Sequence, residues 1–343
     1  MIYGEKVVER PIRWAMVGGG KGSQIGYIHR SAALRDFCFE LVAGAFDIVP
    51  ERGKSFGKNL HVSEERCYPD YKTMFAEEAK RSDGIEAVSI ATPNGTHFEI
   101  CKAALEAGLH VICEKPLCFT YAEALELKRL VEQKRKILGV TYGYAGHQII
   151  EEGRRLVADG ALGEIRIINM QFAHGFHNVA VERNTASTKW RVDPKFAGPS
   201  YVLGDVGTHP LYLSEVMVPQ LKIKRLLCTR QSFVKTRAPL EDNATTLMEY
   251  DNGAVATVWS SGVNCGSMHG QKSALSVKKQ VSNGGTNNLI NYALKCKANR
   301  CVFLSGVWVI YMIPLWSKIA SARDIPKVYL KHGQIYMHVL PGQ

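Results

Sequence analysis

The chain has 343 residues, 46% apolar and 22% charged, which is typical of a globular protein long enough for two domains. Its nine cysteines include no CxxC pair, so we expect neither a disulfide framework nor a zinc site and predict a reducing, cytoplasmic location. Most of the net charge of +11 lies after residue 270, and the first 270 residues, with 33 basic and 31 acidic side chains, exclude a nucleic-acid partner.

The first predicted element is a short buried strand at Ile12–Val17, followed at once by a glycine-rich loop and a helix-compatible run. This order is the context that a dinucleotide-binding fingerprint requires, because glycines let the backbone approach a pyrophosphate at a helix N-terminus. The candidate cofactor-binding glycines are Gly18, Gly20, Gly22 and Gly26. Five residues separate Gly20 from Gly26 where the GxGxxG fingerprint has two, so an ordinary glycine turn is the alternative.

The second predicted strand, Phe39–Phe46, ends beside Asp47, about twenty residues after the glycine loop. A carboxylate here would accept hydrogen bonds from the ribose 2′-hydroxyl of NAD, whereas a nearby arginine would favour the phosphate of NADP. Because Arg52 and Lys54 follow closely, NAD and NADP both remain candidates, and we favour NAD.

The most informative stretch contains two further strands, Ala87–Ala91 and His110–Cys113, with an amphipathic helix between them. Each strand is followed by polar residues, and in a parallel sheet such residues line the ligand crevice. The candidates are Thr92, Asn94 and His97 after the first strand, and Glu114, Lys115 and Pro116 after the second. A helix at Ala122–Lys134 and a strand at Ile137–Tyr144 complete the alternation, which predicts an α/β Rossmann domain with a doubly wound parallel sheet over residues 1–146.

From residue 147 the pattern changes to strands joined by turns, which predicts a second, α+β domain over residues 147–270 with an open, mainly antiparallel sheet. A hairpin at Asp251-Asn252-Gly253 is indicated by its turn residues. The predicted elements are a helix at Gln148–Asp159 and strands at Glu164–Phe172, Ile223–Phe233, Ala244–Tyr250 and Ala254–Ser260.

Within this second domain, Asp205 and His209 are four residues apart, so on a helical turn they would share one face. A histidine beside a carboxylate is a natural proton carrier, because its pKa lies near neutrality and the acid fixes its tautomer. Hydride removal from an alcohol carbon also releases a hydroxyl proton, which such a base would take. The alternative is that Asp205 caps a helix and His209 packs in the core.

Four motifs occur in an order and spacing that resemble those of a known family. They are the glycine loop with Gly26-x-x-His29, the Thr92–His97 run, Glu114-Lys115-Pro116 and the D-x-x-x-H motif. They are similar to the Gfo/Idh/MocA oxidoreductases, the glucose–fructose oxidoreductase and inositol dehydrogenase family, over about residues 10–270. The resemblance implies an NAD(P)-dependent enzyme that oxidises a secondary hydroxyl of a sugar, inositol or related polyol. It also implies a homo-oligomer formed through the sheet of the second domain, if that domain is complete.

The resemblance implies the roles of the site residues as well. Lys115 would orient the substrate hydroxyl, His209 would be the general acid/base, and Asp205 would contact substrate or orient His209. Pro116 would hold the backbone that presents Lys115, while Asn94 and His97 would lie along the cofactor. Trp190 and Arg191 are candidate substrate contacts, with loop packing as the alternative. We expect His174 and His177 at a strand end and predict no metal site.

Residues 271–343 form an anomalous basic and apolar tail, with ten Lys and Arg against one acid, Asp324. Its uncharged run from Cys301 to Ser317 is at the lower edge of membrane-spanning length, so a membrane tail anchor is one interpretation. We favour a reading-frame slip near Gln271. Suitable synonymous codons for Ser276–Asn287, read one base out of register, spell GEKASLEWWDE, a turn and an aromatic strand of the kind the family carries here.

A slipped frame would leave the second domain without its closing strands and make the chain prone to aggregate through an exposed sheet edge. It also keeps a non-catalytic nucleotide-binding protein, regulatory or damaged, as an alternative function. We predict that the nucleotide sequence across codons 265–290, translated in all three frames, opens in one alternate frame into alternating strands with acidic residues restored. If no alternate frame does so, the tail is genuine.

Overall fold

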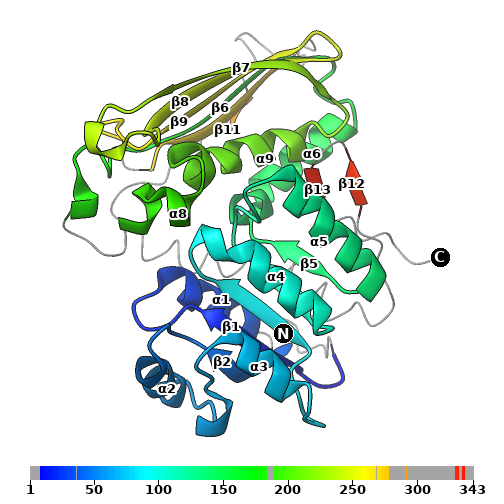
Figure 1. Ribbon diagram of the computed structural model, residues 1–343. Coiled ribbons are helices and arrows are strands. Elements are labelled where there is room, and N and C mark those ends of the chain that lie inside the picture. The colour runs from blue at the N-terminus through cyan, green and yellow to red at the C-terminus, as the bar shows by residue number, and fades with distance from the viewer. Residues whose placement is uncertain are drawn as a thin grey trace. The chain divides into compact units, whose positions relative to one another are not determined.

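The computed structural model describes residues 8–35, 37–183, 189–267 and 269–277, together with the short segments 290–292, 329–331 and 334–336 (Figure 1). The chain divides into two compact units between Thr141 and Tyr142, close to the predicted boundary at residue 146. Each unit has its own sheet and is described by itself.

The first unit contains a five-stranded parallel sheet in the order β2-β1-β3-β4-β5. The strand order reverses at β1, and ligands of such sheets bind at the carboxyl ends of the strands beside this point. The predicted α/β Rossmann architecture is confirmed. Its strands are β1 (Ile12–Gly18), β2 (Phe39–Ala45), β3 (Ala87–Ala91), β4 (His110–Cys113) and β5 (Leu138–Val140).

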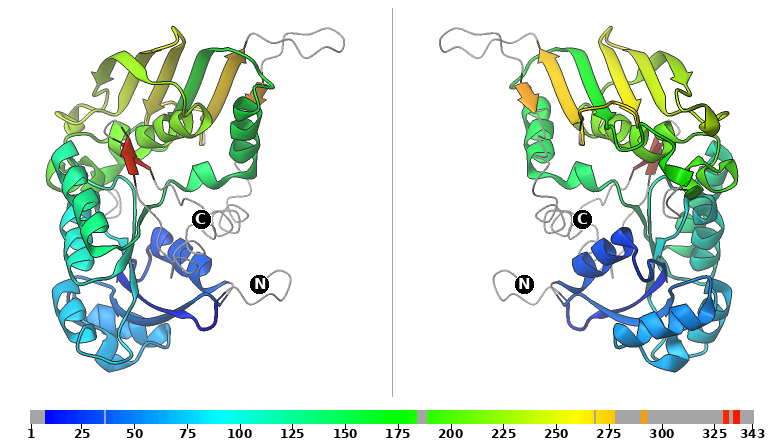
Figure 2. Two further views of the ribbon diagram at one scale, coloured as in Figure 1. Left: turned by 90° about the vertical axis from the view of Figure 1, so that its right-hand side faces the viewer. Right: turned by 90° about the vertical axis from the view of Figure 1, so that its left-hand side faces the viewer.

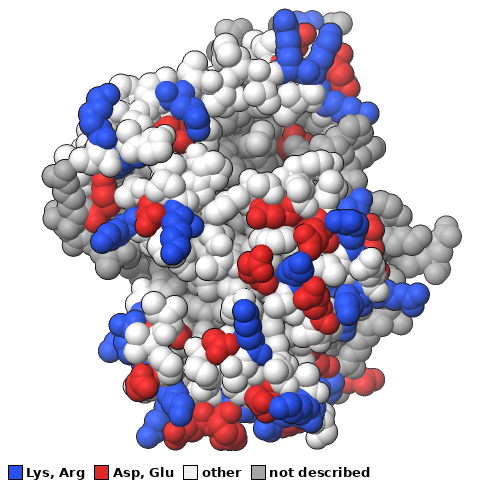
Figure 3. All heavy atoms as spheres, viewed as in Figure 1, with Lys and Arg blue, Asp and Glu red and all other residues white. Residues whose placement is uncertain are grey.

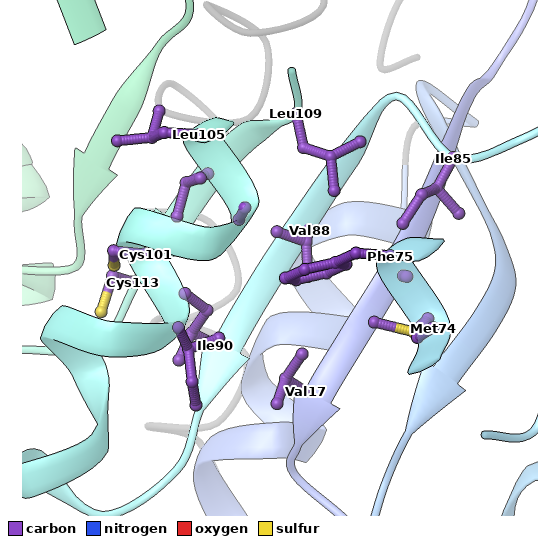
Figure 4. Close-up of a cluster of buried hydrophobic side chains, with 14 of the residues drawn as sticks. Val17, Met74, Phe75, Ile85, Val88, Ile90, Cys101, Leu105, Leu109 and Cys113 are labelled. Atoms are coloured by element: carbon purple, nitrogen blue, oxygen red, sulfur yellow. The ribbon is translucent and has the colours of Figure 1, made fainter. Parts of the chain in front are cut away.

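Helices cover both faces of this sheet because alternate strand residues point to opposite sides. Ile90 and Cys113 pack against Phe75 and Leu105 in the core on one face, which Figure 4 shows. The opposite face buries Trp14 and Met16 among residues of α1 and α2. The helices are α1 (Gln24–Leu34), α2 (Pro50–Asn59), α3 (Tyr71–Glu78), α4 (His97–Glu106) and α5 (Tyr121–Lys134).

Strand β5 is shorter than predicted, ending at Val140 instead of Tyr144. Among the described strands it pairs with β4 alone, and Cys113 is the last β4 residue in that pairing. Beyond it the chain turns into the Lys115–Pro116 segment, whose peptide bond is cis. Residues after Thr141 therefore have no neighbouring strand, and a short 3-10 turn at Gly143–Gly146 follows.

The second unit contains a six-stranded mixed sheet in the order β11-β10-β6-β9-β8-β7. The pairings are antiparallel except between β6 and β9, which confirms the predicted α+β class, and Gly253 makes the predicted hairpin turn with positive φ. Beyond the predicted end of the domain at residue 270, one further strand pairs with β6. The strands are β6 (Ile165–Ala173), β7 (Ile223–Gln231), β8 (Asn243–Tyr250), β9 (Val255–Ser261), β10 (Gln271–Val277) and β11 (Ile290–Tyr292).

One face of this sheet packs against α9, as Figure 2 shows. The opposite face carries exposed apolar side chains on four neighbouring strands. Leu227, Leu247, Val255 and Ile167 are each between 41% and 63% exposed. The helices of this unit are α6 (Gln148–Ala158), α8 (Pro194–Ala197) and α9 (Thr208–Met217).

The predictions for the tail fall largely on residues outside the described part of the chain. After β10 the described residues form β11 and a hairpin of β12 (Tyr329–Lys331) with β13 (Gln334–Tyr336). In the described part of the chain, every helix is too short or too polar to span a bilayer. On the face seen in Figure 3, Lys and Arg side chains are interspersed with Asp and Glu, without a continuous basic stripe.

The described cysteines differ sharply in exposure between the two units. In the first unit Cys38, Cys67, Cys101 and Cys113 are buried and Cys118 is half-buried. In the second unit Cys228 and Cys265 are exposed. All seven are free thiols.

Candidate functional site

The glycine loop lies at the carboxyl end of β1 and leads into α1. A Cβ atom on Gly26 would lie 2.3 Å from the carbonyl oxygen of Gly19, and one on Gly20 would lie 2.5 Å from that of Phe46. Gly22 has a φ of +82° and no atom within 4 Å of its virtual Cβ. The loop therefore presents bare backbone at a helix N-terminus, and this geometry fits a dinucleotide pyrophosphate despite its greater length.

Two side chains, one at the N-cap of α1 and one in the middle of the helix, stabilise this loop. Ser23 caps the helix by accepting a hydrogen bond from the backbone N–H of Gly26 at 3.0 Å. Arg30 donates to the carbonyl oxygen of Gly19 at 2.7 Å while its guanidinium lies over the ring of Phe56. These contacts hold the loop in shape without placing a side chain in the open space next to Gly22.

Asp47 follows β2, as predicted, and one of its carboxylate oxygens accepts hydrogen bonds from Arg52 at 2.7 Å and from the Val49 N–H at 2.9 Å. The hydrogen bond from Arg52 lowers the pKa of the Asp47 carboxyl, so the group is ionised at neutral pH. A partly exposed carboxylate in this position suits a ribose diol and repels a 2′-phosphate.

The carboxyl ends of β1, β3 and β4 lie side by side, which brings the predicted cofactor residues of the first unit together. Gly18 is paired with Ala91, and Ile90 with Cys113. The glycine loop, the Thr92 turn and the segment with Lys115 and Pro116 therefore begin on adjacent strands, as the sequence predicts.

His97 lies inside the first unit, and its ring has no exposed surface. Nδ1 lies 2.7 Å from the carbonyl oxygen of Pro116, and Nε2 lies 2.9 Å from that of Thr92. Burial lowers the pKa of this imidazole, although both carbonyl contacts act in the opposite direction. His97 thus joins the two strand-end segments through its two ring nitrogens. Asn94, 7% exposed, is also buried.

Glu114 also faces inward. Its Oε1 atom lies 2.9 Å from Nε2 of His29 and 2.6 Å from the Thr141 hydroxyl, and the side chain is 12% exposed. Burial opposes ionisation of this carboxyl, but the hydrogen bond from His29 and the charge of Lys115 outweigh it and lower the pKa. Glu114 is therefore a largely enclosed, ionised carboxylate next to Lys115 in the sequence.

In the second unit, His209 is the second residue of α9 and is 5% exposed. Its ring contacts are aromatic edges and faces, with centroid distances of 4.7 Å to Tyr144, 5.8 Å to Tyr142 and 5.9 Å to Phe172. A Cβ on Gly207 would lie 2.8 Å from the Ser260 hydroxyl oxygen, so a larger residue would require a shift where this helix start approaches β9.

Asp205 lies one turn earlier, in a π-helical turn at Leu203–Gly207. Arg191 donates from Nε to its carboxylate at 3.1 Å, and the same guanidinium stacks on Trp190 with 4.5 Å to the ring centroid. The structure thus brings together Asp205 and both predicted substrate residues. Arg191 connects the carboxylate to the indole ring.

Two imidazoles near Asp205, those of His174 and His177, were expected only at a strand end, and their hydrogen bonds come from the structure. His174 directly follows β6, as expected, and its Nδ1 accepts the backbone N–H of Phe176 at 3.3 Å. His177 Nδ1 is hydrogen-bonded to the Tyr201 hydroxyl. Burial lowers the pKa of His174 to about 4, and it also lowers that of His177, so both rings are neutral at pH 7. The neutral ring of His174, whose Nδ1 accepts, carries its proton on Nε2 and is a hydrogen-bond donor there.

Tyr144 and His269 form a second pair that the sequence does not reveal. The hydroxyl of Tyr144 lies 2.8 Å from Nε2 of His269, and burial lowers the pKa of His269 to about 4. A neutral His269 shares a hydrogen bond with the Tyr144 hydroxyl, and the ring of Tyr144 also contacts His209 with its centroid 4.7 Å away. Within the described residues, no group of three or more His, Cys, Asp or Glu side chains has the arrangement of a metal site.

Two family comparisons agree with this geometry. Residues 12–142 match the "Oxidoreductase family, NAD-binding Rossmann fold" of Gfo/Idh/MocA proteins, and residues 150–276 match the "GFO/IDH/MocA C-terminal domain". The chain belongs to the Gfo/Idh/MocA oxidoreductase family, and its first unit is an NAD-binding Rossmann domain.

The relatives are also oxidoreductases. An uncharacterized oxidoreductase, YfiI, of Bacillus subtilis is 61% identical over 274 residues, which cover 79% of this chain and 70% of the relative. Levoglucosan dehydrogenase of Pseudarthrobacter phenanthrenivorans is 29% identical over 232 residues, which cover 62% of this chain and 55% of the relative.

Among solved structures, an inositol dehydrogenase homolog of Azotobacter vinelandii complexed with NAD+ is 57% identical with a TM-score of 0.83, covering 94% of this chain and 89% of that one. The same homolog with NADH and myo-inositol matches with a TM-score of 0.79 and 56% identity, covering 93% and 87%.

Proposed function

We propose that the protein is an NAD(P)-dependent dehydrogenase, with NAD preferred, that oxidises a secondary hydroxyl of a sugar, inositol or related polyol. The observation that carries the proposal is the combination of two groups in one chain. Lys115 follows strand β4 of an NAD-binding unit, and the buried His209 lies one helical turn after Asp205 in the second unit. The myo-inositol complex of the Azotobacter homolog supports the substrate class.

In this reaction Lys115 binds and orients the hydroxyl group, and His209 accepts its proton. The aromatic rings around His209 exclude water and hold the imidazole in one orientation. Asp205 and Arg191 neutralise each other, and the imidazoles beside them are neutral, which suits an uncharged polyol better than a sugar phosphate. When bound, the nicotinamide ring supplies the hydride acceptor.

The proposal is tested by following NADH or NADPH absorbance with purified protein and a panel of myo-inositol, levoglucosan, D-xylose and D-apiose. We expect reduction of NAD+ with at least one of them. The His209→Ala variant should lose about 10²- to 10⁴-fold in kcat. If the wild-type chain binds NADH yet turns over no member of a wider polyol panel, the non-catalytic alternative is correct.

We also propose that the exposed sheet face of the second unit is the surface of a homo-oligomer. Leu227, Leu247 and Val255 lie on adjacent strands, and an apolar patch of this kind is rarely left open to solvent.

A charge placed on this face should therefore disrupt assembly. We expect Leu247→Glu to shift the chain toward the monomer in sedimentation velocity, because a carboxylate would be buried unpaired in the interface. Leu34→Glu, at an exposed leucine of α1, is the matched control and should leave the oligomeric state unchanged. Equal sedimentation of both variants and the wild type would contradict the assignment.

A further inference from the structure

The clearest departure from the sequence-based site is the orientation of Glu114. In β4, Ile112 packs on the side of the sheet covered by α1, and Cys113 packs on the other side. Continuing this alternation past the strand end directs Glu114 toward α1 and Lys115 away from it. The hydrogen-bonding distance between Glu114 and His29, a residue of α1, agrees with this alternation.

The contacts of Glu114 come from both sides of β4. His29 reaches its Oε1 atom from α1, and Thr141 reaches the same oxygen from the end of β5. The backbone N–H of Glu114 donates to the carbonyl oxygen of Ile90 on β3 at 3.0 Å. The residue before Lys115 is thus fixed by three elements of the first unit.

An ionised carboxylate accepts hydrogen bonds and cannot donate them, so His29 must carry its proton on Nε2. A substitution of His29 that removes this donor leaves the carboxylate of Glu114 with one fewer hydrogen bond, which costs free energy because the group is largely enclosed. Helix α1 begins at the glycine loop, and its residue Gly26 lies three positions before His29. Because His29 contacts Glu114, the helix connects the pyrophosphate-binding backbone to this carboxylate.

We propose that Glu114 is a positioning residue for Lys115 and not a contact of the cofactor, with His29 and Thr141 holding its carboxylate in place. The inference rests on the proposed function, in which Lys115 orients the substrate hydroxyl. The negative charge of Glu114 adjoins the lysine in the chain, and the fixed backbone limits the directions in which the lysine extends. Other titratable groups also interact with the carboxylate. His29 from α1 is hydrogen-bonded to it, and His97 from α4 and the Cys113 thiol lie close enough to interact with its charge.

The test compares Glu114→Gln, which removes the charge and keeps the shape, with His29→Leu and His29→Gln. We expect Glu114→Gln and His29→Leu to lower kcat at least 10-fold, with KM and the NADH dissociation constant, measured by fluorescence, within 3-fold of wild type. His29→Gln retains an N–H donor and should recover most of the lost kcat. The pH profile of kcat should shift in Glu114→Gln.

Glu78→Gln is the matched control, because Glu78 is a buried carboxylate of the same unit that is bonded to Arg66 and Tyr68. It should lower the melting temperature and leave kcat, KM and the pH profile unchanged. If Glu114→Gln instead weakens NADH binding 10-fold or more, Glu114 is a cofactor contact, as the sequence predicts. An unchanged kcat would also overturn the proposal.

A second measurement is independent of turnover, and so separates this inference from the proposed function. Hydrogen–deuterium exchange of a peptide covering residues 111–118 should rise in Glu114→Gln and His29→Leu and stay at the wild-type level in Glu78→Gln. Exchange equal to wild type in both site variants would refute the positioning role even in a chain that oxidises no polyol. Where Glu114→Gln does not fold, Thr141→Val provides the same comparison.

Discussion

Replacing Lys115 by alanine is expected to lower kcat by about 10³-fold or more while NADH binding stays within about 3-fold of wild type. The structure places this lysine at the carboxyl end of β4, directly before a cis peptide bond and directly after the buried Glu114. Steady-state kinetics with the best substrate of the polyol panel measure the first quantity, and fluorescence titration measures the second.

The control for this experiment is Lys102→Ala, a lysine on α4 whose ammonium pairs with Glu126 at the surface. It should change neither quantity, because an exposed ion pair contributes little to stability and this one is remote from the strand ends. A Lys115→Ala variant with kcat within 3-fold of wild type would remove Lys115 from the catalytic group. Loss of NADH binding with unchanged kcat at saturation would make it a cofactor ligand.

Replacing Arg237 by alanine is expected to destabilise the second unit by about 3–5 kcal/mol. The side chain has no exposed surface and binds Glu182 at 3.1 Å, Asp242 at 3.4 Å and the carbonyl oxygen of Val179 at 2.6 Å. Asp242, equally buried, would lose the guanidinium and keep the backbone N–H groups of Phe233 and Val234, so its charge would be poorly compensated.

Urea unfolding followed by tryptophan fluorescence would measure this loss. Arg225→Ala is the matched control, since Arg225 forms an ion pair with Glu249 but its side chain is 79% exposed. It should cost less than about 1 kcal/mol. Equal destabilisation by the two variants would show that burial of Arg237 adds nothing to the strength of its contacts.

The fold was predictable because its elements have strong local patterns. The bounds of β3 and β4 agree with prediction, since runs of small and β-branched residues end there in polar turns. The length of β5 was not predictable from its own residues. It depends on where β4 turns away, and pairing between distant segments is invisible to local pattern.

The candidate site divides in the same way. The residues that follow β3 and β4 could be placed on adjacent strands because parallel strands share an edge. Motif reasoning could not tell which of them face inward, and it assigned His97 to the cofactor although the ring is enclosed. The pairs His177 with Tyr201 and Tyr144 with His269 are 24 and 125 residues apart, so only the tertiary structure brings them together.

The separation of thiols by exposure gives the protein an internal probe of folding. A maleimide reagent should modify Cys228 and Cys265 quickly in the native state, whereas Cys101 and Cys113 become accessible only when the NAD-binding unit opens. Mass spectrometry of labelled peptides would then report the opening of that unit separately from the second one. Ligands that bind the native Rossmann domain should slow labelling of the buried pair in proportion to their affinity.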